Sequence, residues 1–276
     1  MSDSEHVQCP PLWDGVAAPW PDEKAWPLLI CVLGTFRVLQ AGHPVSVRGG
    51  KTEALLHMLA LHHTAGLPRA TLLGALWPDS DSALAGEALY SRLHGLHARL
   101  GPALGGQAPV LQVDGHYRLN SGAGVGVDVA CFDDLATTGD RQARGGHAAD
   151  AVALYGQAVQ LYHGDLCMAA DLYAVVERER LRARYLTLLA SLGTNAYHAG
   201  DSAASLAYAQ RVLSYDPCRE DAHRLVMRCH VRQGERAQAL HQFRVCADIL
   251  RVAFETMPEP ETVALFEQVR RDPTSV

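Results

Sequence analysis

The sequence predicts a mainly α protein of two domains, with small antiparallel sheets confined to the N-terminal one. Its length of 276 residues is more than one small domain needs. Short β-rich runs occur only before residue 120, whereas helical patterns fill most of the remainder and part of that remainder repeats after 34 residues. Apolar residues make up 48% of the chain, which is typical of globular proteins and excludes a disordered one.

The first strands are expected after a loosely ordered extension. Residues 1–26 contain four prolines and show no helical or strand period. From Leu28 onward, β-rich apolar runs at 28–33, 36–39 and 44–47 are separated by glycine-containing turns. These runs predict a small antiparallel sheet.

Three helices and a hairpin are predicted next. Leucine and alanine recur at helical spacing in 52–63 and 69–77, and leucines stand at positions 89, 93, 96 and 100 of the segment 82–100. Asp81 or Ser82 is the expected N-cap of this third helix, and Gly101 with Pro102 its end. Strand-like residues 110–113 and 117–119, joined by an Asp-Gly turn, predict a β-hairpin.

This order of elements is typical of one DNA-binding fold. In a winged helix-turn-helix a small sheet, three helices and a terminal hairpin follow one another, the third helix enters the major groove and the hairpin contacts the backbone. We therefore expect residues 27–120 to form a winged helix-turn-helix DNA-binding domain.

The rest of the chain predicts repeated helices. The glycine-rich residues 121–126 are expected to be a linker, and residues 127–272 to be all-α. Three residues recur after a shift of 34 positions: Gly200 as Gly234, Ala203 as Ala237 and Leu206 as Leu240. This period is that of tetratricopeptide repeats, whose stacked helix pairs bind other chains. We expect a tetratricopeptide-like domain.

Several longer segments carry a resemblance to a known family. They are Leu33–Val38, Ala75–Pro78, Gly115–Leu119, Tyr162–Leu166, Asp216–Arg224 and Pro258–Thr262. The chain resembles the bacterial transcriptional activator domain (BTAD) proteins, including the antibiotic regulatory proteins (SARP) of actinobacteria, which join an OmpR-type winged helix to a tetratricopeptide-like activator domain. The resemblance implies a transcriptional activator that binds promoter DNA and whose helical domain forms a homodimer or contacts RNA polymerase.

The third predicted helix is the candidate DNA-reading element. On a helical wheel Arg92 and Arg99 lie on one flank of its outward face, and Tyr90 and His97 on the other. In the family the end of this helix is rich in arginine, whereas Gly95, His97 and Ala98 stand at the corresponding positions here. We predict DNA contacts from Tyr90, Ser91, Arg92, His94, His97 and Arg99 on the helix, and from Arg48, Lys51 and Arg118 outside it.

Two of these predicted contacts depend on pH. Histidine gains a proton below about pH 6.5, so His94 and His97 would then attract DNA more strongly. The alternative is that both are ordinary solvated side chains.

The charge distribution along the chain bears on the prediction of DNA binding. The net charge of -6 is unusual for a nucleic-acid-binding protein. Residues 27–120, however, hold seven Lys and Arg against five Asp and Glu, so that this segment is basic while the segments on both sides of it are acidic. Because the third helix has few arginines, we expect weak binding by a monomer. An alternative function is a protein-interaction scaffold whose winged helix no longer binds DNA.

The sequence does not favour an enzyme. Residues 49–52, Gly-Gly-Lys-Thr, resemble the end of a phosphate-binding loop, but Val45 stands where that motif requires its first glycine. No hydrolase, metalloprotease or dinucleotide motif occurs.

Metal, cofactor and membrane binding are not expected either. The seven cysteines form no C-x-x-C pair, which predicts reduced thiols and neither a metal nor a cofactor. With no apolar run of membrane-spanning length and no signal peptide, we expect a cytoplasmic protein with no membrane partner.

Overall fold

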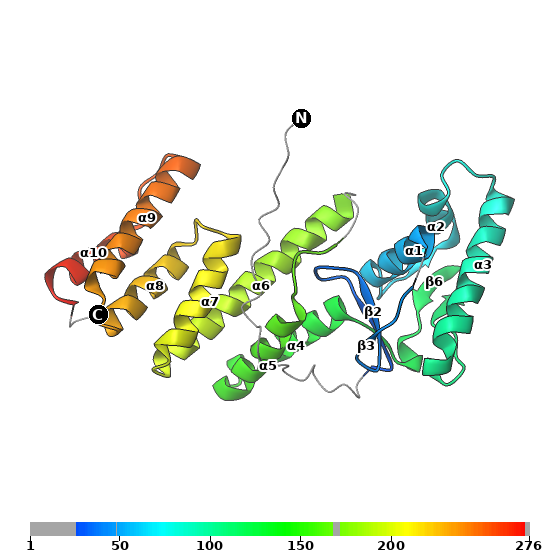
Figure 1. The fold of residues 1–276 in the computed structure, drawn as a ribbon, viewed down its shortest axis with the longest axis horizontal. Coiled ribbons are helices and arrows are strands. Elements are labelled where there is room, and N and C mark those ends of the chain that lie inside the picture. Colours follow the sequence, from blue (N-terminus) through cyan, green and yellow to red (C-terminus); the bar gives the residue numbers. More distant parts are fainter. Residues whose placement is uncertain (1–25, 48, 168–171, 274–276) are drawn as a thin grey trace.

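The computed structural model describes residues 26–47, 49–167 and 172–273, which form an elongated molecule (Figure 1). One end combines helices with the strands, and the other end is entirely helical. This arrangement confirms the predicted mainly α fold with small N-terminal sheets. Nearly all of the predicted N-terminal extension lies outside the described residues.

The first sheet has four strands in the order β3-β2-β1-β7. β1 (Leu28–Cys31) pairs antiparallel with β2 (Arg37–Gln40), which pairs with the short β3 (His43–Pro44). β7 (Val125–Val127) pairs with β1 in parallel, so the sheet is mixed and not purely antiparallel. This fourth strand overlaps the predicted linker, residues 121–126. The sequence did not indicate it, because a pairing between strands so distant in sequence leaves no local pattern.

The three predicted helices are present at the strand-rich end. They are α1 (Gly50–Leu61), α2 (Arg69–Leu76) and α3 (Ser82–Leu100). The Asp81 side chain caps α3 by accepting a hydrogen bond from the Ala83 N–H at 2.8 Å. Leu89, Leu96 and Leu100 of the predicted seam are buried. Helix α3 ends at Leu100 with Gly101 as its C-cap, as predicted, and the chain continues as a 3-10 helix, η1 (Gly101–Leu104).

A second, three-stranded sheet holds the predicted hairpin. β5 (Val110–Val113) and β6 (His116–Leu119) pair antiparallel, and β4 (Leu67–Pro68) adds to the outer side of β6. Asp114 and Gly115 both have positive φ in the turn between β5 and β6, as an Asp-Gly hairpin requires. Because β4 lies between α1 and α2, this sheet connects the hairpin to the three helices.

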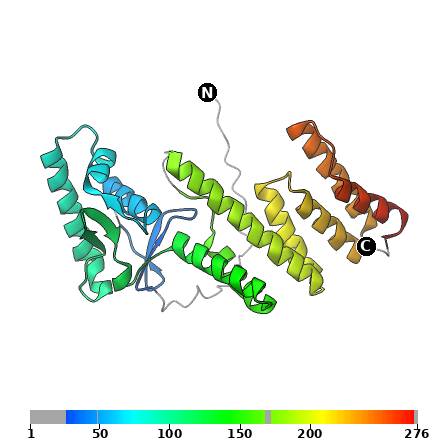
Figure 2. The same ribbon diagram turned by 180° about the vertical axis from the view of Figure 1, so that it is seen from behind.

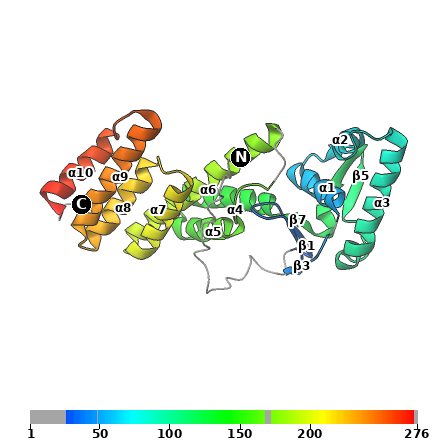
Figure 3. The same ribbon diagram turned by 45° about the horizontal axis from the view of Figure 1, so that its top comes forward.

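In the part of the chain that the structure describes, seven α-helices follow along the molecule (Figures 1 and 2). They are α4 (Asp128–Arg144), α5 (Ala148–Leu161), α6 (Leu172–His198), α7 (Ser202–Tyr215), α8 (Glu220–Arg232), α9 (Arg236–Phe254) and α10 (Pro260–Arg271). Figure 3 shows α7 to α10 side by side in a row, as in a repeat stack. The repeated glycines have one role, since Gly200 and Gly234 both have positive φ in the turns before α7 and α9.

The strand-rich end and the first helices share one hydrophobic core. It runs from Leu28 and Leu56 through Phe132 to Leu189. The sequence division at residues 121–126 therefore falls within a packed region, where η2 (Ser121–Ala123) leads into β7. The division into domains at these residues stays a prediction.

Candidate nucleic-acid interface

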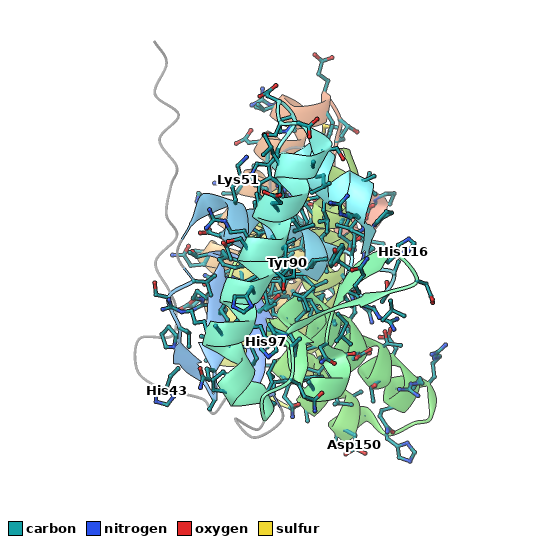
Figure 4. The ribbon with its side chains drawn as sticks, turned by 90° about the vertical axis from the view of Figure 1, so that its right-hand side faces the viewer. His43, Lys51, Tyr90, His97, His116 and Asp150 are labelled. Carbon is teal, nitrogen blue, oxygen red and sulfur yellow. The ribbon has the colours of Figure 1, made fainter. Side chains whose placement is uncertain are left out.

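Helix α3 presents two different flanks to solvent, as the helical wheel predicts. Figure 4 views it along the long axis of the molecule, with Tyr90 and His97 along α3, Lys51 on one side and His116 of the hairpin on the other. Tyr90 is 73% exposed and its ring stacks beside that of His94, with centroids 6.4 Å apart.

The arginine flank of α3 borders a groove. The groove has a volume of about 170 Å³ and lies between α3 and the start of α1. Its lining residues are Val47, Thr52, Ser91, Arg92, Gly95, Leu96 and Arg99. The structure thus brings three predicted DNA-contacting residues, Ser91, Arg92 and Arg99, to one site. Thr52 and Val47 belong to this site as well, and no sequence pattern indicated them.

Two of the predicted residues make contacts within the protein. The Lys51 ammonium donates a hydrogen bond to the carbonyl of Leu76 and lies 5.9 Å from the centroid of the Trp77 ring. A cation at this position interacts favourably with the C-terminal carbonyls of α2. Nε2 of His97 lies 3.1 Å from the carbonyl oxygen of Gly106, in the loop after η1. Both side chains therefore help to hold α3 and its neighbours in place.

The remaining predicted residues are dispersed. Arg118 is exposed on β6, where exposed and buried side chains alternate. Arg48 lies outside the described residues. Arg69, which sequence reasoning missed, is exposed at the start of α2. A Cβ placed on Gly86 would lie 1.9 Å from Nη2 of Arg69, so this side chain lies against α3, a contact that no sequence pattern indicated.

The distribution of ion pairs separates the two ends of the molecule. Every ion pair between two described residues joins side chains at position 133 or later. Arg180 of α6, for example, binds Asp133 of α4 at 2.6 Å. By contrast, Arg69, Arg92, Arg99 and Arg118 form no ion pair with another described residue. The cations around α3 are thus available to an external anion.

A buried carboxylate joins the strand-rich end to the helices. Asp128, at the start of α4, is 1% exposed. It accepts hydrogen bonds from the N–H groups of Val32 and Leu33, at 2.8 and 2.9 Å, and from that of Val129. Burial raises the pKa of Asp128 to about 6, although these three N–H groups and Arg37 act in the opposite direction. One side chain therefore links the end of β1 to the start of α4.

The described residues show neither a metal centre nor a membrane span. No group of three or more His, Cys, Asp or Glu side chains among them is placed to hold a metal ion. None of the helices in this part of the chain is long and apolar enough to cross a membrane.

Comparisons with known proteins connect this architecture to one family. The family model of the bacterial transcriptional activator domain matches residues 127–270. The chain is 26% identical over 239 residues to Regulatory protein AfsR of Streptomyces coelicolor, a match that covers 85% of this chain and 24% of AfsR. The chain thus spans about a quarter of the length of this curated relative.

A solved structure has a similar fold. It is Mycobacterium tuberculosis EmbR in complex with a low affinity phosphopeptide, with a TM-score of 0.72 and 20% sequence identity. The similarity covers 89% of this chain and 65% of that one. It therefore extends over both the strand-rich and the helical end.

Proposed function

Because this chain belongs to the bacterial transcriptional activator domain family, we propose that it activates transcription in the cytoplasm by binding promoter DNA. Residues 27–120 bind the DNA through α3 and the hairpin of β5 and β6. Residues 127–272 dimerise or contact RNA polymerase, using the stacked helices as a binding surface for another protein.

The unpaired arginines around α3 are the observation that supports DNA binding. Most arginines at the helical end bind carboxylates or backbone carbonyls of the protein itself. Arg92 and Arg99 are exposed, have no such ion pair and flank the groove beside α3. Phosphate contacts by such cations supply much of the affinity of a protein for DNA. The net charge of -6 does not oppose this, because the excess of acidic residues lies outside residues 27–120.

DNA binding is tested by mobility shift with the full-length protein on fragments that tile the region upstream of its own gene. We expect one fragment to be retarded at least about tenfold more strongly than the others, with an affinity that falls steeply between 50 and 200 mM salt. Arg92→Ala and Arg99→Ala should each weaken this binding. The matched control is Arg244→Ala, which removes an exposed arginine of α9 at the opposite end of the molecule (Figure 1) and should leave binding unchanged.

Equally weak retardation of every fragment would contradict the proposal. The chain would then act as a protein-interaction scaffold. Sedimentation of the protein with and without the retarded fragment distinguishes dimerisation from monomeric binding. Addition of RNA polymerase to the retarded complex tests for a ternary complex.

A further inference from the structure

Two arginines and a histidine from three elements meet where the strand-rich end contacts the helices. Arg37 begins β2, His163 lies in the connection between α5 and α6, and Arg211 is in α7. Burial lowers the pKa of His163, and the charges of Arg37 and Arg211 lower it further. Both guanidinium groups are therefore close enough to the imidazole to oppose its protonation, and positive charge is concentrated at this junction.

Backbone contacts bring the first two of these elements together. Gly34, in the turn before β2, has a φ of +91°, and a Cβ placed on it would lie 3.1 Å from the carbonyl carbon of His163. The N–H of Gly34 donates a hydrogen bond to the carbonyl of Asp165 at 3.0 Å. The turn that leads to Arg37 thus packs directly against the segment that carries His163.

A cluster of tyrosines positions Arg211 beside the same segment. Nε of Arg211 donates a hydrogen bond to the hydroxyl of Tyr185 at 3.1 Å, and its guanidinium carbon lies 5.5 Å from the centroid of the Tyr215 ring. The Tyr185 ring stacks on that of Tyr162, the residue before His163, with centroids 4.1 Å apart. These contacts with neutral side chains orient Arg211 without neutralising its charge.

The guanidinium group of Arg37 points to a ligand at this junction. Among the described residues, its Nε is the one buried side-chain nitrogen or oxygen that has no hydrogen-bond partner. Buried donors normally have a partner, and an unpaired donor is most costly in a charged group. Neither Arg37 nor Arg211 forms an ion pair with another described residue. The junction thus offers two positive charges and an unsatisfied N–H donor to an acceptor.

Two carboxylates lie in the same region, but both are engaged elsewhere. The oxygens of Asp128 accept three backbone N–H groups, and this carboxylate and Arg37 influence each other without forming an ion pair. Oδ1 of Asp165 accepts a hydrogen bond from the hydroxyl of Tyr162 at 2.7 Å. Neither carboxylate neutralises the two arginines directly, which leaves that role to an external anion.

We propose that Arg37, His163 and Arg211 form a binding site for a phosphate group, either free or carried by a small molecule, between the strand-rich end and the helices. A phosphate monoester carries a charge of about −1.5 to −2 at pH 7 and three acceptor oxygens, so it can bind guanidinium groups on two sides at once. Because Nε of Arg37 is buried, a small anion reaches it more readily than the backbone of a DNA duplex does. The inference goes beyond the proposed function, since neither α3 nor DNA takes part in it.

The first test measures binding of inorganic phosphate to the full-length protein by isothermal titration calorimetry at constant ionic strength. We expect saturable binding with a Kd of about 1 mM. Arg37→Gln and Arg211→Gln should each weaken it at least about tenfold, because each removes a charged hydrogen-bond donor. Arg244→Gln, an exposed position of α9, is the control of equal charge and should bind like the wild type. Arg37→Lys keeps the charge but lacks the planar fork and should bind with intermediate affinity, which also covers the case that Arg37→Gln does not fold.

The second test identifies the class of anion. Glucose 6-phosphate and inorganic phosphate are compared with acetate under the same conditions. Either phosphate compound should bind at least about tenfold more tightly than acetate, which carries a single charge. The comparison of the two phosphate compounds distinguishes an esterified phosphate from a free one.

Three outcomes would overturn the inference. The first is no binding of either phosphate compound, or equal binding by the wild type and both glutamine variants. The second is acetate binding as tight as that of phosphate, which would indicate a carboxylate site. The third is a loss of affinity for the retarded DNA fragment in the variants with no loss for phosphate, since the arginines would then contact DNA. Phosphate binding is measured without DNA, so its failure leaves the proposed function intact, and a failure of DNA binding leaves this inference intact.

Discussion

A single carboxylate, that of Asp128, links the two ends of the molecule. It accepts three backbone N–H groups from two segments almost one hundred residues apart in sequence. The end of β1 is held a second time, because the N–H of Cys167 donates to the carbonyl of Val32 at 2.9 Å. Buried hydrogen bonds therefore hold the strand-rich end against α4, in addition to the hydrophobic core that the two share.

Replacement of Asp128 should change how stability depends on pH. Its pKa rises from an ordinary value of 3.8 to about 6 on folding, so the wild-type protein loses stability as pH rises through this window. Asp128→Asn lacks this ionisation. The difference in unfolding free energy between variant and wild type should thus shift in the variant's favour by on the order of 3 kcal/mol between pH 4 and pH 7.

Urea unfolding at both pH values measures this difference. Asp134→Asn, an exposed position of the same helix, is the control and should show no such shift. If the difference in unfolding free energy between Asp128→Asn and the wild type is the same at pH 4 and pH 7, Asp128 has the same pKa in the folded and the unfolded protein, and the prediction is wrong.

At the scale of elements, the position of α3 depends on the turn between α1 and β4. Gly66 has a φ of +70° in this turn, and a Cβ placed on it would lie 2.6 Å from the carbonyl oxygen of Tyr117 in β6. The close approach lets β4 pair with β6 and so brings the hairpin against the three helices. The fold therefore requires glycine at position 66, whereas it does not require the glycine at position 95 of α3.

Two glycine substitutions should therefore have opposite effects. Gly66→Ala should lower the unfolding free energy by about 1–3 kcal/mol because of the positive φ and the clash with β6. Gly95→Ala should raise it by about 0.5–1 kcal/mol, because the site is open and alanine favours the helix. Thermal unfolding of both variants checks the signs; a stabilised Gly66→Ala would contradict the account of the turn.

Among the described residues of the whole molecule, one large core is accompanied by smaller clusters, two of which lie toward the C-terminal end. The large core includes Leu28 of β1, Leu89 of α3 and Leu189 of α6. A separate small cluster holds α8, α9 and α10 together through residues such as Met227 and Val269. Size and separation of these cores indicate which parts unfold together.

Hydrogen exchange of the native protein should show this division. We expect the amides of β1 and α6 to open with the same free energy, and those of α9 and α10 with a lower one. Exchange of residues 27–120 as a unit distinct from α4 to α6 would contradict the shared core.

Local patterns predicted most of the elements correctly. The leucine spacing of α3, the cap at Asp81, the Asp-Gly hairpin and the 34-residue repeat all depend on residues close together in the chain, so they can be read from the sequence. The same spacing predicted which residues of α3 face outward. The groove was not predictable, because Thr52 reaches it only through the packing of α1 against the rest of the fold.

The sequence by itself determined the order of the elements, the outward face of α3 and the family to which the chain belongs. Only the tertiary structure decided that β7 completes the first sheet, that Asp128 joins the two ends and that Lys51 binds α2 within the protein. The physical reason is distance along the chain. Helix periods and turns arise from neighbouring residues, whereas these contacts join residues from 25 to 97 positions apart and exist only once the chain has packed.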